Sequence, residues 1–120
     1  MTLVEIAYST RTPARLVVST SIDRDTTVVA FQGDADLTSL PFLVDVIAAV
    51  IAEKDGAVVL DLAGTEFIDT ACVRAIGLAA QSLADRGRHM TFRSPSRFVA
   101  MLLATFGLTH LVEADGDMEH

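Results

Sequence analysis

Cysteine is almost absent from the sequence, with Cys72 alone among 120 residues, so no disulfide can form within the chain. Long hydrophobic runs are absent too. The longest, from Ile47 to Ala52, is far shorter than the roughly 18 residues of a membrane-spanning helix. The first residues show neither the basic start nor the apolar stretch of a secretory signal peptide. Together these absences predict a protein of the reducing cytoplasm, without direct insertion into a membrane.

Basic residues are scarce compared with acidic ones. Lys and Arg number 9 against 16 Asp and Glu, which gives a formal net charge of −7 at pH 7. This balance argues against binding to nucleic acid or to an anionic membrane surface, because both need a basic face. The acidic residues concentrate between Asp23 and Asp69, whereas five arginines fall between Arg74 and Arg97. With 51% hydrophobic residues, the chain is expected to fold as one domain rather than stay disordered.

Motifs that mark an enzyme are also missing. The seven glycines are scattered singly, so no glycine-rich loop is available to hold a phosphate group. His89, His110 and His120 fall on separate predicted elements and Cys72 is isolated, which leaves no metal-ligand spacing. No serine stands in the strand, sharp turn and helix of a nucleophile motif. We therefore expect a protein without catalytic activity, metal or cofactor.

The hydrophobic pattern predicts strands and helices in the order β-β-α-β-α-β-α. The expected strands cover residues 15–21, 26–31, 57–62 and 89–93, and residues 108–112 can add a short last strand. The expected helices begin near Thr38 or Ser39, near Asp69 or Thr70, and at Ser94-Pro95-Ser96, and they end before Asp55, Gly87 and Gly107. The first two strands form a hairpin, and the continuous apolar third strand is typical of an inner strand covered by helices. The order is that of a single α/β domain with a mixed sheet and helices packed against it.

The pattern is weaker at both ends of the chain. Residues 1–14 show no clean period and are expected to form an N-terminal arm or a frayed strand. Residues 113–120 are acidic and are expected to form a flexible tail. The folded domain is therefore placed at residues 15–112.

Two acidic loops follow neighbouring predicted strands. Asp34 and Asp36 follow the second strand, and Glu66 and Asp69 follow the third. Loops at the same end of parallel strands gather at one edge of the sheet, where ligands and partners bind. Each residue also has a structural interpretation, since Asp36 can stabilise the turn before a helix and Asp69 can cap the next helix. The two loops together would form a negative surface suited to a basic partner.

The same two loops carry a family resemblance. Residues 33–36, Gly-Asp-Ala-Asp, resemble the G-x-x-D that follows a strand in STAS domains, the family of anti-sigma factor antagonists. Residues 58–72, VVLDLAGTEFIDTAC, are similar to the second motif of that family. Its usual form is a hydrophobic strand, Asp-Leu-Ser-Gly, two or three residues, Phe-Ile-Asp-Ser-Ser-Gly and a helix. The resemblance extends from about Arg15 to Val112.

The resemblance implies a function in protein binding. Antagonists of this family bind an anti-sigma factor, often a serine kinase, and thereby release a sigma factor. The kinase switches the antagonist off by phosphorylating the second serine of Asp-Ser-Ser-Gly, which adds about −1.5 to −2 charges near a helix N-terminus. A homodimer is also compatible with the sequence. The implied docking surface comprises Asp34, Asp36, Thr38, Asp69, Thr70, Ala71, Cys72 and Arg74.

The chain departs from the family pattern at the phosphorylation motif. Ala71, which has no hydroxyl, stands at the acceptor position, and Cys72 stands at the glycine position. In one interpretation, Ala71 locks the protein in its unphosphorylated, binding-competent form. In a second, Thr70 accepts the phosphate, although a role as the helix N-cap is favoured for it. In a third, the chain is an accessory subunit of a bacterial lipid-transport ABC complex, because those STAS subunits also resemble it in reading Asp-Thr-Ala.

Cys72 has two interpretations of its own. A thiol in the first turn of a helix can have its pKa lowered by the helix dipole, which would allow a redox switch. Cysteine is also a common small core residue, and the neighbouring Asp69 opposes formation of a thiolate. The second interpretation, an inert thiol, is favoured.

Overall fold

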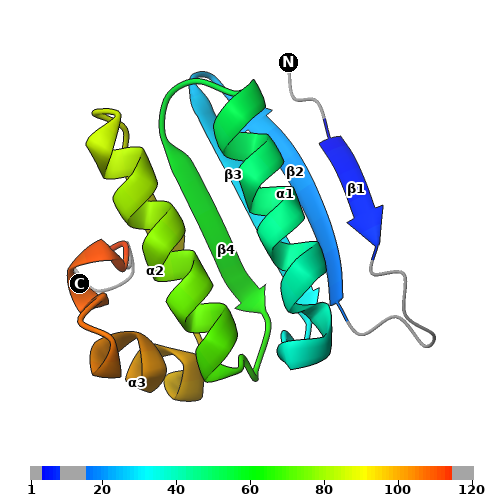
Figure 1. Ribbon diagram of the computed structural model, residues 1–120, viewed down its shortest axis with the longest axis vertical. Coiled ribbons are helices and arrows are strands. Elements are labelled where there is room, and N and C mark those ends of the chain that lie inside the picture. Colours follow the sequence, from blue (N-terminus) through cyan, green and yellow to red (C-terminus); the bar gives the residue numbers. More distant parts are fainter. Residues whose placement is uncertain (1–3, 9–15, 115–120) are drawn as a thin grey trace.

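A five-stranded sheet with helices packed against it forms the fold (Figure 1). The computed structural model describes residues 4–8 and 16–114. The strands are β1 (Val4–Tyr8), β2 (Leu16–Asp23), β3 (Thr26–Gly33), β4 (Val58–Gly64) and β5 (Met90–Arg93). The helices are α1 (Leu40–Glu53), α2 (Thr70–Asp85) and α3 (Arg97–Thr105), with short 3-10 turns η1 (Leu37–Ser39) and η2 (Thr109–Leu111). The predicted α/β domain with a mixed sheet is confirmed.

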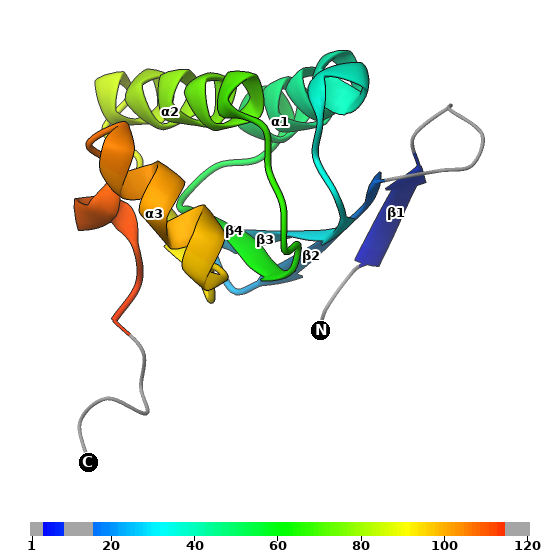
Figure 2. The ribbon, with the colours of Figure 1, turned by 90° about the horizontal axis from the view of Figure 1, so that it is seen from below.

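The strands lie side by side in the order in which they follow along the chain. β1, β2 and β3 pair antiparallel, whereas β3, β4 and β5 pair parallel. Parallel neighbours need a crossover connection, and here α1 joins β3 to β4 and α2 joins β4 to β5. Both helices cover the same face of the sheet (Figure 2). The loops that lead from β3 into α1 and from β4 into α2 consequently start at the same edge of the sheet.

The core lies between the sheet and its helices. Alternate residues of β3 are buried, whereas Val58, Val59 and Leu60 of β4 are each no more than 5% exposed. Burial on both faces of β4 agrees with the inner strand predicted from its continuous apolar run. α3 lies beside α2 and adds Val99 and Leu103 to the core (Figure 2). The buried apolar side chains of α1 and α2 are Leu43, Ile47, Val50, Ile51, Cys72, Val73, Ile76, Ala80 and Leu83.

Arg88, just beyond α2, fastens the C-terminal end of α1. Its Nε donates to the carbonyl oxygen of Gly56 at 2.8 Å, and its Nη1 donates to the carbonyl oxygen of Ile51 at 2.9 Å. The last carbonyl groups of a helix have no partners within the helix and carry partial negative charge. The guanidinium of Arg88 therefore donates hydrogen bonds to carbonyl groups at this end of α1 and places a positive charge beside them. It also links the C-terminal ends of α1 and α2.

The prediction of a short last strand at residues 108–112 is wrong. Residues 109–111 form η2, and Val112 alone makes an isolated parallel bridge, to Phe92 of β5. The chain turns here because Gly107 follows α3 with a φ of 73°, in the left-handed region that glycine favours. The N–H of Leu108 then donates back to the carbonyl of Leu103, the arrangement of a Schellman motif.

The two ends of the chain are described only in part. Within the expected N-terminal arm, residues 4–8 form β1 at the edge of the sheet, and residues 1–3 and 9–14 lie outside the described residues. Within the expected flexible tail, Glu113 forms an ion pair with Arg93 at 3.0 Å, and residues 115–120 lie outside the described residues. No helix in the described ranges is long and apolar enough to cross a membrane.

Gly64 ends β4 where the backbone of this strand lies very close to that of its parallel neighbour β3. A Cβ atom at this position would lie 2.7 Å from the carbonyl oxygen of Phe31 and 3.3 Å from the Cα atom of Gln32. The register of the two strands also shifts here, between Ala30 and Gln32. This close approach of the two backbones therefore requires a residue without a side chain at position 64.

Gly64→Ala is expected to lower the free energy of unfolding by about 1–3 kcal/mol, the usual cost of overpacking, because the obstructing atoms belong to the backbone. Gly77→Ala in α2 is the matched control. Its Cβ would contact the side chain of Leu108 at 3.4 Å, and alanine favours a helix, so stability should be kept or increased. Urea unfolding followed by circular dichroism measures both variants. Equal stability of the two variants would contradict the close approach of the β3 and β4 backbones at Gly64.

Candidate functional site

The loops after β3 and β4 are joined through their backbones. The N–H of Ala35 donates to the carbonyl of Phe67 at 3.2 Å, and the N–H of Asp69 donates to the carbonyl of Ala35 at 2.7 Å. Ala35 and Ile68, both buried, form an isolated parallel bridge that continues the pairing beyond the sheet. The two acidic loops that the sequence places at one edge of the sheet are thus direct neighbours.

Asp36 caps the turn that leads into α1. Its Oδ1 accepts hydrogen bonds from the backbone N–H groups of Thr38 at 3.0 Å and Ser39 at 3.1 Å, and also from the Thr38 hydroxyl. In return, the N–H of Asp36 donates to Oγ of Ser39 at 2.9 Å, which completes a capping box. The sequence expected Thr38 or Ser39 to provide the cap. Ser39 is the N-cap residue of α1, but its side chain makes no capping hydrogen bond to that helix, and Asp36 caps the 3-10 turn η1 that precedes α1.

Asp69 caps α2. Its Oδ1 accepts from the N–H of Ala71 at 2.9 Å, which satisfies one of the donors that a helix start leaves without a partner. Thr70 is the first residue of the helix, and its exposed hydroxyl lies 3.5 Å from the same carboxylate oxygen. The N-cap role favoured for Thr70 is therefore wrong. The hydroxyl contributes little to the helix start and faces solvent.

Cys72 is fully buried beneath these caps. Its thiol donates to the carbonyl oxygen of Asp36 at 3.3 Å, so the first turn of α2 is tied to the loop after β3. Burial, followed by the charges of Asp69 and Asp36, raises the pKa of Cys72 from 9.0 to about 11, and a backbone hydrogen bond at Asp69 opposes this rise. The geometry agrees with the inert interpretation of this thiol. Position 72 fills the space between the loops, and a partner protein cannot reach it without opening the core.

The predicted docking residues differ in how exposed they are to solvent. Asp34, Thr38, Thr70 and Arg74 are exposed, Asp36, Asp69 and Ala71 are half-buried, and Cys72 is buried. Arg74 and Ala71 line a hollow of about 390 Å³ between the start of α2 and Leu40 of α1, together with Thr70, Ala75 and Leu78. The exposed groups thus lie on the two joined loops and on the first turns of α2. Within the described ranges, no three His, Cys, Asp or Glu side chains gather as metal ligands.

Three exposed apolar side chains at this end of the molecule were not predicted. Leu37, which follows Asp36 in the chain, is 61% exposed. The rings of Phe67 and Phe98 stack with their centroids 5.4 Å apart. The hydroxyl of Ser96 donates to the carbonyl of Glu66 at 3.2 Å and fastens the β4–α2 loop to α3. The sequence gives a weak signal for Leu37, a large apolar residue between polar ones in a loop. It gives none for Phe98, whose helical spacing matches that of core residues.

Comparison with protein families gives one match. A family model described as Mlab, STAS domain, matches residues 18–113, which include both loops and all three helices. Among proteins of curated function, none matches the chain in sequence.

Several solved structures share the fold at low sequence identity. SpoIIAA of Bacillus, an anti-sigma factor antagonist in its unphosphorylated form, has a TM-score of 0.67 at 16% identity, covering 82% of this chain and 87% of that chain. An anti-sigma factor antagonist from Mycobacterium paratuberculosis has a TM-score of 0.69 at 21% identity, covering 85% and 88%. The murine anion transporter Solute Carrier 26 family member A9 has a TM-score of 0.53 at 17% identity, covering 79% of this chain and 14% of the transporter.

The Cys72 thiol of the folded protein is expected to react with iodoacetamide far more slowly than free cysteine at neutral pH, because it is both inaccessible and protonated. In urea the rate should rise to that of free cysteine. Intact-mass measurements over time follow both reactions. A native rate equal to that of free cysteine would restore the redox interpretation.

The raised pKa also predicts a pH dependence of stability. Because the folded protein holds the Cys72 proton up to about pH 11 and the unfolded chain only to about 9.0, the free energy of unfolding should fall as pH rises through this window. Cys72→Ala removes the ionisable group and should flatten that part of the decline. Urea titrations of both proteins at several pH values test it, and identical slopes would contradict the assigned environment.

Proposed function

The chain belongs to the STAS domain family, and from this membership we propose that it is a regulatory protein-binding module, an anti-sigma factor antagonist. It binds an anti-sigma factor in the cytoplasm and thereby releases a sigma factor. The observation that carries the proposal is the backbone junction of the β3–α1 and β4–α2 loops, since it makes one surface from the two motifs that resemble this family. Neither catalysis nor a cofactor is needed for this activity.

The proposed docking surface consists of the solvent-facing atoms of Asp34, Asp36, Leu37, Thr38, Asp69, Thr70, Ala71 and Arg74. Cys72 is left out because it is buried, and Leu37 is added because its exposed side chain supplies the apolar anchor that a polar rim surrounds. The carboxylates favour a partner with a complementary basic patch, which would speed association and select against acidic proteins.

Two of the carboxylates on this surface also stabilise the starts of helical turns. Asp36 and Asp69 each use Oδ1 to cap a helical turn, so replacing either one weakens the helix start as well as any contact with a partner. Asp34 is exposed and has no partner among the described residues. Its charge is therefore free for recognition, and a substitution there separates binding from folding.

Ala71 makes the proposed antagonist permanently able to bind. The family switch needs a hydroxyl at this position in the first turn of α2, and alanine has none. Thr70 is exposed and could in chemical terms accept a phosphate, but its hydroxyl lies beside the carboxylate of Asp69, where added negative charge is repelled. We propose that control acts on the amount of this protein or on its partner rather than on a phosphate at this turn.

A second candidate function is that of an accessory subunit in a bacterial lipid-transport ABC complex. Two observations favour it: Asp69-Thr70-Ala71 resembles the turn of those STAS subunits, and the matching family model is described as Mlab. Such a subunit would bind an ATPase domain through the same surface. The two functions thus share a docking surface and differ in the partner.

Asp34→Lys is expected to weaken binding to the partner by about tenfold or more while leaving thermal stability unchanged, because this carboxylate is exposed and has no partner among the described residues. Asp55→Lys is the matched control, since Asp55 is also exposed but lies in the loop between α1 and β4, at the opposite edge of the sheet. The tagged protein is first used to capture its partner from the native lysate. Capture of an anti-sigma factor supports the first function and capture of an ABC ATPase supports the second; equal affinity of both variants would contradict the docking surface.

The mass of the protein is expected to stay unchanged after incubation with ATP and native lysate, because the acceptor hydroxyl is missing at position 71. Ala71→Ser supplies that hydroxyl and serves as the positive control for an active kinase. Intact-mass spectrometry measures both proteins, and Thr70→Val identifies the site if the unaltered chain gains mass. Phosphate on Thr70 would contradict permanent binding competence.

A further inference from the structure

The β4–α2 loop, residues 65–69, lies between two other segments of the chain. On one side is the β3–α1 loop, where the N–H of Ala35 donates to the carbonyl of Phe67 and the carbonyl of Ala35 accepts from the N–H of Asp69. On the other side is α3, which begins beside the start of α2 (Figure 1). The loop that carries Asp69 of the proposed docking surface is thus held from two sides.

α3 holds this loop at two consecutive residues. The hydroxyl of Ser96 donates to the carbonyl oxygen of Glu66 at 3.2 Å. The ring of Phe98 stacks on that of Phe67 with an interplanar angle of 17°, a geometry that aromatic pairs favour when the rings are offset. The neighbouring carbonyls of Glu66 and Phe67 are therefore bound by different segments, the first by α3 and the second by the β3–α1 loop.

α3 is itself firmly placed, so it can act as a support. Val99 and Leu103 on its inner side are 0% and 1% exposed. Oγ of Ser96 accepts from the N–H of Val99 at 3.1 Å and so caps the helix. One hydroxyl thus accepts a hydrogen bond from its own helix and donates another to the loop. A carboxylate could cap the helix equally well but would have no proton to donate.

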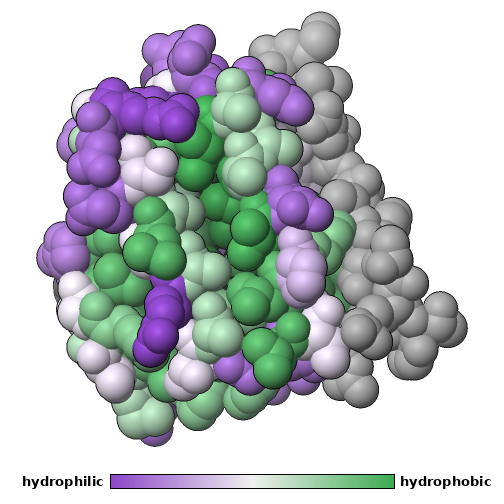
Figure 3. All heavy atoms as spheres, viewed as in Figure 1, coloured by the Kyte–Doolittle hydropathy of each residue, from purple (hydrophilic) through white to green (hydrophobic). Residues whose placement is uncertain are grey.

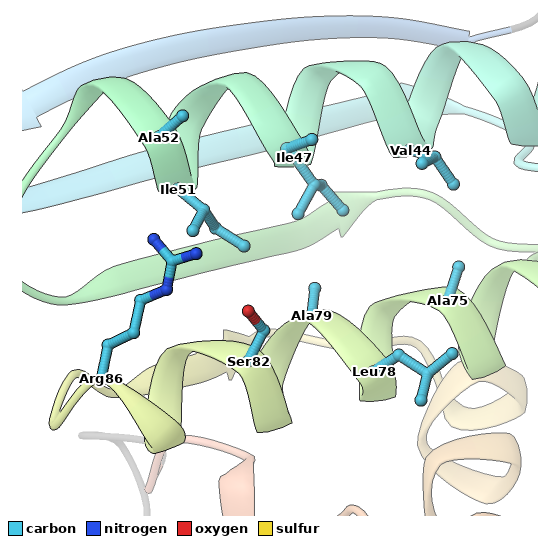
Figure 4. A pocket seen from close by; sticks show the side chains of 10 residues that line it. Val44, Ile47, Ile51, Ala52, Ala75, Leu78, Ala79, Ser82 and Arg86 are labelled. Carbon is cyan, nitrogen blue, oxygen red and sulfur yellow. The ribbon is translucent and has the colours of Figure 1, made fainter.

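The outward faces of α1 and α2 do not interlock in the same way. A groove of about 380 Å³ runs between them, and Figure 3 shows hydrophobic side chains along both helices on this face. Ala75 and Ala79 of α2 stand opposite Val44 and Ile47 of α1 across the groove (Figure 4). The small side chains of α2 leave this space open, so the contacts that set the start of α2 against the start of α1 lie in the loops.

We propose that Ser96 and Phe98 are positioning residues for the docking surface, an inference that rests on the proposed function of that surface. They hold the β4–α2 loop where its backbone pairs with the β3–α1 loop. α3 thereby sets how Asp69 lies relative to the acidic residues of the other loop. A change at the start of α3 consequently alters partner binding without altering any residue of the surface.

Four backbone amides report on this positioning in the protein alone. The N–H groups of Ala35 and Asp69 form the two hydrogen bonds between the loops. The N–H groups of Thr27 and Val58 serve as internal controls, because they donate at 2.9 Å to carbonyls at the opposite edge of the same sheet. Amide hydrogen exchange measured by NMR follows all four, since exchange reports how often each hydrogen bond opens.

Ser96→Asp is expected to raise the exchange rates of the Ala35 and Asp69 amides by about tenfold, because the loop loses its donor while the cap of α3 is kept. The amide of Val99 should stay protected, which shows that the helix start is intact. Phe98→Leu removes the ring stacking by a different route and should have the same effect on Ala35 and Asp69. Both variants should leave the exchange of Thr27 and Val58 unchanged.

Conservative variants distinguish positioning from a general loss of stability. Ser96→Thr keeps the hydroxyl and Phe98→Tyr keeps the ring, so each should retain the exchange rates of the unaltered protein. Met101→Leu is the control on α3, since Met101 is 57% exposed and a leucine there preserves an apolar side chain. Thermal unfolding checks that every variant folds.

Unchanged exchange at Ala35 and Asp69 in both Ser96→Asp and Phe98→Leu would overturn the proposal. So would an equal rise at all four amides, because that result would mean that α3 stabilises the whole domain rather than the loop. No anti-sigma factor or ATPase takes part in the measurement. The positioning role can therefore fail while the proposed function stands, and the proposed function can fail while the positioning role stands.

Discussion

Two backbone hydrogen bonds at Ala35 hold together the two loops of the candidate site. They extend the parallel pairing of β3 and β4 by one bridge beyond the sheet, into the loops. Because of that bridge, the capping carboxylates of Asp36 and Asp69 lie on adjacent turns, and the thiol of Cys72 can reach the loop after β3. Without it, the two loops would be separate connections, each free to move.

Folding and recognition compete for the same carboxylates. A helix start needs an acceptor for its first N–H groups, and a docking surface needs charge that is free to meet a partner. Asp36 and Asp69 serve the first need with Oδ1, while Asp34 has no partner among the described residues and is the carboxylate that we propose for recognition. An acidic motif of this kind would therefore be retained for its stability even in a chain that had lost its partner.

Sequence reasoning recovered the elements whose signals are local. The alternation of strands and helices, the inner position of β4 and the neighbouring loops follow from hydrophobic period and turn residues. What it missed depends on contacts between distant segments. The 3-10 turn η1 precedes α1, α3 positions Phe98 to stack on Phe67, and the turn at Gly107 leads into η2 in place of a last strand. None of these is encoded in a period of two or of 3.6 residues.

α1 and α2 are tied to each other at both ends. Arg88 holds the carbonyl of Ile51 at one end, and the thiol of Cys72 holds the carbonyl of Asp36, next to the start of α1, at the other. These hydrogen bonds oppose sliding and splaying of the two helices, so they help to set the width of the space between them before anything enters it. A molecule that binds there loses its own freedom of motion but causes little further ordering of the protein, and its affinity is correspondingly greater for the area it covers.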